Sequence, residues 1–342
     1  MARADLLKKL FRSYRSRDDH GFAEAAQEVI EEERRKHHVT VANELERIMR
    51  NGTALHREPR GLNGFDPPPR DSERRTSLLE VRHPERQLDD LVLDDQLRQS
   101  IQRVMEEYRE WEVLEANGLA PTQRALFCGP SGCGKTATAE AVATELALPL
   151  LYVRFDSVVS SLLGETAANL RKVFDYAARG QWVVLFDEFD AIGRSRDDAT
   201  EHGEIKRVVN SFLQIMDSFM GRSLVIAATN FEASLDPAVW RRFDEVLRFG
   251  KPNTNQIKCL VQRRLKPLSF DTAVVNKIAS GLKAASFADA ERVCLDIRKQ
   301  AAIRGKSVVA AQDVEDALAT QRYRRQILEQ ATTLDSPTVD RE

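Results

Sequence analysis

A glycine-rich loop carries the clearest chemical signal in this sequence. It reads Gly129-Pro130-Ser131-Gly132-Cys133-Gly134-Lys135-Thr136 and matches the pattern G-x-x-x-x-G-K-[ST]. Glycines let a backbone wrap closely around phosphate, which then binds to backbone N–H groups and to the start of the following helix. Lys135 can reach the β and γ phosphates, and the Thr136 hydroxyl can hold Mg²⁺. The spacing therefore predicts a nucleoside triphosphate site, in which we interpret Cys133 as a filler of the loop rather than a nucleophile.

Two acids follow an apolar stretch further along the chain. Val183-Val184-Leu185-Phe186 directly precedes Asp187 and Glu188. A strand this apolar suits the centre of a parallel sheet, and its carboxyl end is where ligands gather in α/β folds. At that edge Asp187 can orient Mg²⁺ through a water molecule, and Glu188 can polarise an attacking water. Acids in this position favour hydrolysis over nucleotide binding alone.

Alternating strands and helices are predicted to position these residues. The strands are expected at 124–129, 150–155, 182–187, 223–230 and 246–249. Helical segments lie between them, which indicates an α/β class with a parallel sheet.

The remaining segments divide the chain into five parts. Three apolar stripes with helical spacing predict a helical N-terminal domain, whereas proline and charge without periodicity predict a semi-flexible linker. After the α/β part the sequence is mainly helical and then polar. The predicted parts are 1–52 (helical domain), 53–86 (Pro-rich linker), 87–250 (α/β part), 251–322 (helical part) and 323–342 (polar tail).

Composition excludes several classes of protein. The 342 residues include 51 Lys and Arg against 53 Asp and Glu, so the net charge of −2 argues against nucleic acid as a partner of the whole chain. The four cysteines form no C-x-x-C pair, which is typical of reduced thiols. No apolar run approaches the roughly 18 residues of a membrane span, and the first residues lack the apolar stretch of a signal peptide. We therefore expect a cytoplasmic protein without a membrane span.

The glycine-rich loop, the acid pair and two later segments together resemble the ATPases of the AAA family. The later segments are Ala228-Thr229-Asn230 and Leu235-Asp236-Pro237-Ala238-Val239-Trp240-Arg241-Arg242-Phe243-Asp244. The resemblance covers about residues 87–322. It implies the P-loop NTPase fold: a five-stranded parallel sheet with helices on both faces, followed by a C-terminal helical lid. ATP and Mg²⁺ would lie between the sheet and the lid.

The resemblance also implies roles for residues outside the two motifs. Asn230 matches the polar residue that senses the γ-phosphate and helps to position water. Arg242 matches the arginine finger, which enters the site of a neighbouring subunit, so activity would require a ring, usually a hexamer. Leu91 and Val92 fall in the segment that lines the adenine pocket, and Ala288 falls in the lid stretch that borders the nucleotide.

The sequence departs from the family pattern at three places. Glu245 stands where a second arginine is common, and Phe287 replaces a glycine of the lid stretch. The pore segment that grips polypeptide in many relatives is matched by Leu162-Leu163-Gly164, which lacks the usual aromatic residue. Packing of these leucines in a core remains the alternative interpretation, so threading of a substrate is left open.

Three functions fit these observations. The first is a ring-forming Mg²⁺-dependent ATPase that remodels or unfolds a protein, with residues 1–52 recruiting a substrate or adaptor. The second is the motor of a two-protein system that serves a separately encoded protease or effector, since no H-E-x-x-H motif supports a built-in metalloprotease. The third is a nucleotide-gated assembly switch without threading, which the aliphatic Leu162 keeps open.

Overall fold

The computed structural model describes residues 8–9, 19–35, 67–71, 75–153, 158, 163–189, 199–230 and 237–334. The chain divides into two compact units, Met1–Asp66 and Pro67–Glu342.

One helix is described in the first unit. Helix α2 (Asp19–Arg35) buries Ala25 and Ile30, and the Lys9 ammonium lies 2.8 Å from the Glu28 carboxylate. This helix falls within the second of the three stripes predicted in 1–52. The other two stripes lie largely outside the described residues.

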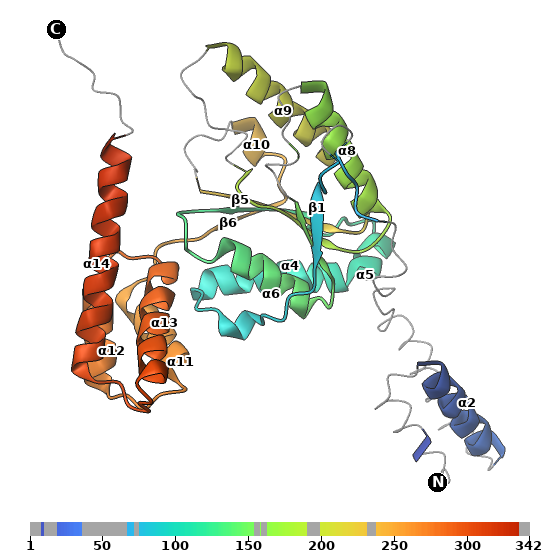
Figure 1. Ribbon diagram of the computed structural model, residues 1–342. Coiled ribbons are helices and arrows are strands. Elements are labelled where there is room, and N and C mark those ends of the chain that lie inside the picture. The colour runs from blue at the N-terminus through green and yellow to red at the C-terminus, as the bar shows by residue number, and fades with distance from the viewer. Residues whose placement is uncertain are drawn as a thin grey trace. The chain divides into compact units, whose positions relative to one another are not determined.

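A six-stranded sheet organises the second unit, in the order β1-β3-β4-β5-β2-β6 (Figure 1). Strands β2 to β6 pair in parallel, which confirms the predicted five-stranded parallel sheet. Strands β4 and β5 are buried along their whole length, as their uninterrupted apolar sequences require. The strands are β1 (Leu79–Arg82), β2 (Arg124–Cys128), β3 (Leu150–Val153), β4 (Val183–Phe186), β5 (Leu224–Thr229) and β6 (Glu245–Arg248).

Helices cover both faces of this sheet (Figure 1). One face carries α4 (Asp95–Arg109), α5 (Trp111–Ala116) and α6 (Lys135–Glu145). The other carries α8 (Leu163–Ala178), α9 (Ala199–Asp217) and α10 (Pro237–Trp240). Rings from three elements join the second face, where Phe174 stacks on Phe186 and meets Phe212 edge-on. Among the described residues, no helix combines the length and apolar content needed to cross a bilayer.

The predicted linker 53–86 is wrong at its C-terminal end, because residues 79–82 form strand β1 of the sheet. It pairs antiparallel with β3 at the edge of the sheet, and Leu78 and Leu79 are fully buried. The Asn169 amide donates to the Asp71 carboxylate at 2.7 Å, which ties the preceding segment to α8. The alternation Leu79-Glu80-Val81-Arg82 is a strand pattern, but the surrounding prolines and charges obscured it. Residues 53–66 of the predicted linker lie outside the described residues.

Four helices form the lid: α11 (Thr254–Leu265), α12 (Thr272–Gly281), α13 (Phe287–Ile303) and α14 (Ala311–Leu334). Side chains of Asn253, Asp271 and Ser286 accept backbone N–H groups at the starts of α11, α12 and α13. Helix α14 continues beyond residue 322, so the prediction of a polar tail from 323 is wrong for residues 323–334. Residues 335–342 lie outside the described part.

Candidate functional site

The glycine-rich loop joins β2 to α6 and is pressed between β6 and the lid. Gly129 adopts a φ of +140°, and a β carbon there would lie 2.0 Å from the Phe249 carbonyl oxygen. Gly132 adopts a φ of +73°, and its β carbon would lie 2.8 Å from the Ser286 hydroxyl. Both positions exclude a side chain on conformational and steric grounds. The motif therefore holds its backbone close to the lid, as a phosphate-wrapping loop must.

Lys135, the first residue of α6, points its ammonium into this loop. Its Nζ donates to the carbonyl oxygens of Gly129 at 2.6 Å and Pro130 at 3.1 Å. It also donates to the Asn230 amide oxygen at 2.8 Å, although 95 positions separate the two residues in sequence. The residue is only 6% exposed, so these oxygens compensate a buried charge. Lys135 and Asn230 thus lie at one place, at the carboxyl ends of β2 and β5.

Thr136 and Asp187 bring two oxygen ligands together beside the loop. The Thr136 hydroxyl donates to Asp187 Oδ2 at 2.7 Å. Hydroxyl and carboxylate oxygens suit Mg²⁺, which takes few protein ligands and completes its shell with phosphate and water. The described residues contain no cluster of three or more His, Cys, Asp or Glu side chains that could enclose a metal alone. The donor set therefore fits a nucleotide-bound Mg²⁺ rather than an all-protein metal site.

Glu188 is held in an unusual backbone conformation next to this pair. Its φ is +53°, a region that residues other than glycine rarely adopt, and its N–H donates to Asp187 Oδ1 at 2.9 Å. Strain of this kind gathers at functional sites, where the surrounding structure enforces it. The Glu188 side chain is exposed and the adjacent Phe189 is buried, so the turn presents the carboxylate at the sheet edge.

These residues line a pocket of about 290 Å³ between the sheet and the lid. Its wall includes Leu91 and Val92 from the segment after η1 (Leu88–Asp90), and Ala288 from α13. Its position between the phosphate loop and the lid is the one that the family resemblance implies for ATP. It is lined by these predicted residues: Leu91, Val92, Ser131, Gly132, Cys133, Gly134, Lys135, Thr136, Asp187, Glu188, Asn230 and Ala288. Burial raises the pKa of the Cys133 thiol despite the nearby Lys135 charge, so the thiol stays protonated.

Two arginines fix the segment that carries Leu91. The Leu91 carbonyl accepts a hydrogen bond from Arg98 of α4 at 3.4 Å and another from Arg263 of α11 at 3.2 Å. Arg263 also contacts the Asp89 carbonyl, and Arg98 donates to the Asp89 carboxylate at 2.9 Å. The same carbonyl is therefore bound from the sheet part and from the lid. Sequence reasoning missed both arginines, because their partner is a backbone atom.

Four more lid residues line the pocket, and sequence reasoning singled out only Phe287 among them. They are Leu260 and Arg264 on α11, and Phe287 and Glu291 on α13. Each pair is separated by four positions, which places both side chains on one helix face. This periodicity was visible in the sequence, but the face that meets the pocket depends on how the lid docks.

Arg242 lies away from this pocket. It follows α10 and forms an ion pair with Asp217 at the end of α9, and Arg124 shares that carboxylate at 3.3 Å. Its side chain is 49% exposed, and it is absent from the described lining of the pocket. The structure of one chain therefore does not bring the candidate finger to its own phosphate loop.

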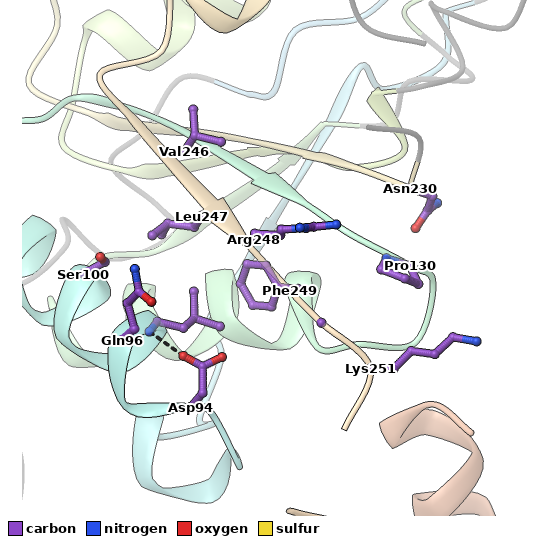
Figure 2. A pocket seen from close by; sticks show the side chains of 12 residues that line it. Asp94, Gln96, Ser100, Pro130, Asn230, Val246, Leu247, Arg248, Phe249 and Lys251 are labelled. Carbon is purple, nitrogen blue, oxygen red and sulfur yellow. Dashed lines mark hydrogen bonds between the residues drawn. The ribbon is translucent and has the colours of Figure 1, made fainter. Parts of the chain in front are cut away.

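A second, wider pocket of about 830 Å³ lies along β6, the outermost strand of the sheet (Figure 2). Gln96 and Ser100 of α4 form one wall, and Arg248 and Lys251 lie on the opposite side. Pro130 and Asn230 belong to its wall as well. This open face consequently reaches the phosphate end of the first pocket.

The candidate pore segment is only partly described. Leu163 and Gly164 form the first residues of α8, whereas Leu162 and the side chains of all three lie outside the described residues. Their role in a pore stays a prediction.

Comparisons with known proteins agree with this geometry. The model of the family described as "ATPase family associated with various cellular activities (AAA)" matches residues 125–251. The chain is 39% identical over 328 residues to the "Uncharacterized AAA family ATPase y4kL" of Sinorhizobium fredii, which covers 95% of this chain and 97% of the relative.

Two further relatives are matched over part of their length. The chain is 30% identical over 255 residues to the proteasome-activating nucleotidase of Methanopyrus kandleri, covering 72% of this chain and 58% of the relative. It is also 30% identical over 252 residues to the ATP-dependent zinc metalloprotease FtsH 3 of Sphaerobacter thermophilus, covering 72% and 51% respectively.

Proposed function

Because this chain belongs to the AAA family of ATPases, we propose that it forms a ring and uses Mg²⁺-dependent ATP hydrolysis to remodel or unfold a protein substrate. The observation that carries the proposal is the convergence of four side chains on one pocket. Lys135 contacts Asn230 at 2.8 Å and Thr136 contacts Asp187 at 2.7 Å. Hydrolysis of ATP is the activity of the family; the ring, the metal and the protein substrate are what we add.

Each of these side chains has a distinct role in the proposal. Lys135 stabilises the charge of the β and γ phosphates, in place of the carbonyl oxygens that it now contacts. Asn230 reports the γ-phosphate and helps to position the attacking water. Glu188 polarises that water from its strained turn. Mg²⁺ held by Thr136 and Asp187 would neutralise phosphate charge as the bond to the γ-phosphate breaks.

Arg242 is the reason for proposing a ring. The pair with Asp217 keeps it on the surface, outside the described lining of its own pocket. An exposed arginine at this place can serve the site of a neighbouring copy, where it would stabilise charge in the transition state. A hexamer is the ring size that we propose. The absence of Arg242 from the described lining of its own pocket supports completion of the site by a second subunit.

The separate first unit supports recruitment of a protein. Residues 1–66 form their own compact unit, and eight of the 17 residues of its described helix α2 are charged. We propose that the helical domain 1–52 binds a substrate or adaptor in the cytoplasm. The ATPase part then begins near residue 67 rather than at 87, because β1 belongs to its sheet.

Replacement of Glu188 by Gln tests the catalytic part of this proposal. The amide preserves the shape of the side chain but cannot take up a proton from water, so ATP binding should persist while hydrolysis falls by about 10²–10⁴-fold. Phosphate release and equilibrium nucleotide binding measure the two effects. Glu110→Gln, an exposed acid between α4 and α5, is the matched control and should hydrolyse ATP normally. Retained hydrolysis in Glu188→Gln would reject the role of Glu188.

The same variant tests the protein partner. With ATP bound but not hydrolysed, Glu188→Gln should retain a substrate that the wild type releases. Co-purification from the native host should therefore recover a protein that depends on both ATP and residues 1–52. If no ATP-dependent partner is recovered in either the full chain or a chain lacking 1–52, remodelling is contradicted.

A motor that serves a separate protease is the second candidate. The likeness to a protein named proteasome-activating nucleotidase favours it. In this case the recovered partner would be a protease or other effector rather than a substrate, and its activity would depend on ATP hydrolysis by this chain.

A further inference from the structure

An ion pair in the lid, between Arg264 and Glu291, lines the nucleotide pocket. We propose that Glu291, held by Arg264, accepts a hydrogen bond from a ribose hydroxyl of the nucleotide and makes the site prefer ribonucleotides. This inference rests on the proposed nucleotide site. Both residues line that pocket, Arg264 from α11 and Glu291 from α13.

The geometry of the pair leaves one oxygen available to a ligand. Arg264 Nε donates to Glu291 Oε1 at 2.9 Å, and a second guanidinium nitrogen contacts the same oxygen. Glu291 Oε2 receives no hydrogen bond from the side chains or backbone that the structure describes. The Glu291 side chain is 41% exposed, so a ligand can reach it. The two contacts from Arg264 to Oε1 also restrict rotation of the carboxylate, so the position of Oε2 is fixed as well.

The position of α13 relative to the phosphate loop indicates which part of the nucleotide meets Glu291. The Ala288 N–H donates to the Gly132 carbonyl at 3.1 Å, so the first turn of α13 lies against the loop. Glu291 comes one turn later, about 4.5 Å further along the helix. In a nucleotide the ribose directly follows the α-phosphate, whereas the base lies beyond it. One helical turn from the loop is therefore the level of the ribose.

The chemistry of the carboxylate also limits which group of the nucleotide can bind Glu291. An ionised carboxylate only accepts hydrogen bonds, and the nucleoside of ATP offers donors on its ribose hydroxyls and on its 6-amino group. Apolar side chains of Leu91, Val92 and Leu260 line the pocket and suit the faces of a base. The charged pair is thus matched to the polar ribose, and a charge-assisted hydrogen bond there adds selectivity against deoxynucleotides.

The test compares nucleotides that cannot be hydrolysed further. The full chain is titrated with ADP, 2′-deoxy-ADP and 3′-deoxy-ADP, and the ratio of dissociation constants is recorded. We expect the wild type to bind ADP about 10-fold more tightly than at least one deoxy analogue, the effect of one hydrogen bond to a charged group. In Glu291→Ala this ratio should fall to about 1, because the acceptor is gone.

Arg264 acts through Glu291 and is a positioning residue. Arg264→Ala should lower the same ratio, and Arg264→Lys should restore part of it by keeping a cation beside Oε1. Glu315→Gln is the matched control, since Glu315 forms a similar lid ion pair with Lys277 outside the described lining of the pocket. Its ratio should equal that of the wild type. Glu291→Gln serves as the second variant if Glu291→Ala does not fold, and it should also lower the ratio.

Several outcomes would overturn the proposal. An unchanged ratio in the folded Glu291 variants shows that the ribose is not recognised by this residue. If the Glu291 variants bind the deoxy analogues as the wild type does but lose discrimination against the diphosphate of a purine riboside without the 6-amino group, the contact belongs to the base instead. If the wild type binds ADP but the ratio is near 1, the ribose inference alone fails. If it binds neither ADP nor ATP, the proposed nucleotide site fails with it.

Discussion

At the scale of single residues, Gly129 shows how closely the phosphate loop is packed. Phe249 N donates to the Cys128 carbonyl at 2.7 Å, which holds the end of β6 beside the loop. A methyl group at Gly129 would collide with the Phe249 carbonyl and would force an alanine into a φ of +140°. Relief of this collision requires the ends of β2 and β6 to separate, and those ends support the loop.

We therefore expect Gly129→Ala to destabilise the protein by roughly 2–5 kcal/mol, from backbone strain together with overpacking. Thermal unfolding measures the loss. Gly250→Ala is the matched control one residue beyond Phe249, because a β carbon there meets nothing within 4 Å. It should leave the melting temperature nearly unchanged. Equal melting temperatures for both variants would contradict this account of the loop.

Some residues of the site could be predicted from the sequence, and others could not. Lys135, Thr136 and Asp187 could be predicted because a local motif fixes the backbone on which each side chain stands. Arg264 and Glu291 could not, because their position depends on docking of the lid against the loop. Their spacing marks one helix face, but spacing alone does not tell which faces meet across a pocket.

At the scale of elements, the sequence predicted the five parallel strands but not the antiparallel strand β1 or the C-terminal part of α14. The parallel strands were recognisable because burial on both faces leaves uninterrupted apolar sequences. Strand β1 has only four residues, and two of them are charged. It forms because it pairs with the sheet, not because its sequence strongly favours a strand. The C-terminal part of α14 was predicted to be a tail because most of its residues are polar, and its apolar Tyr323 and Ile327 are exposed rather than packed in a core.

The first turn of helix α14 contains a buried acid, Asp313, whose charge should contribute to stability. Asp313 is 5% exposed and accepts the Ala310 N–H at 3.0 Å and Arg304 at 3.0 Å. The Ala310 N–H, together with the charges of Lys306 and Arg304, lowers the pKa of Asp313 despite its burial. A lowered pKa stabilises the fold above the unfolded value of about 3.9, and this contribution is lost as the pH falls through the folded value.

Asp313→Asn should therefore lower the melting temperature at pH 7, and the gap to the wild type should narrow from about pH 4 downward. Thermal unfolding at pH 7, 5, 4 and 3 measures that gap. Asp316→Asn, one turn later on the same helix and exposed, should show little difference at any pH. A gap for Asp313→Asn that stays constant down to pH 3 would show that its charge does not stabilise the lid.

At the scale of the whole molecule, the separation of Arg242 from its own pocket leads to a mixing experiment. Arg242→Ala lacks the proposed finger, and Lys135→Ala lacks the phosphate contact, so each alone should hydrolyse ATP at least about 10³-fold more slowly. In mixed rings, about one quarter of the head-to-tail interfaces would combine an intact finger with an intact loop. The mixture should therefore recover activity that neither variant shows alone.

Arg222→Ala is the control for this experiment. Arg222 is 43% exposed and pairs with Glu115, so it resembles Arg242 in exposure and in having an acidic partner. Its loss should leave the ATPase rate close to that of the wild type. Absence of any recovery in the mixture, under conditions where subunits exchange, would contradict a finger that acts between copies.

The doubly bound carbonyl of Leu91 has a consequence for the timing of the catalytic cycle. Arg98 reaches it from the sheet part and Arg263 from the lid, while the adjoining Val92 packs against the core of the lid. This wall of the pocket is therefore held by the sheet part and by the lid at once, and a movement of the lid would break the contact from Arg263. Opening of a lid limits turnover in many enzymes. We therefore expect Arg263→Ala to release ADP faster than the wild type, a kinetic property that no motif encodes and that the dissociation rate of ADP measures.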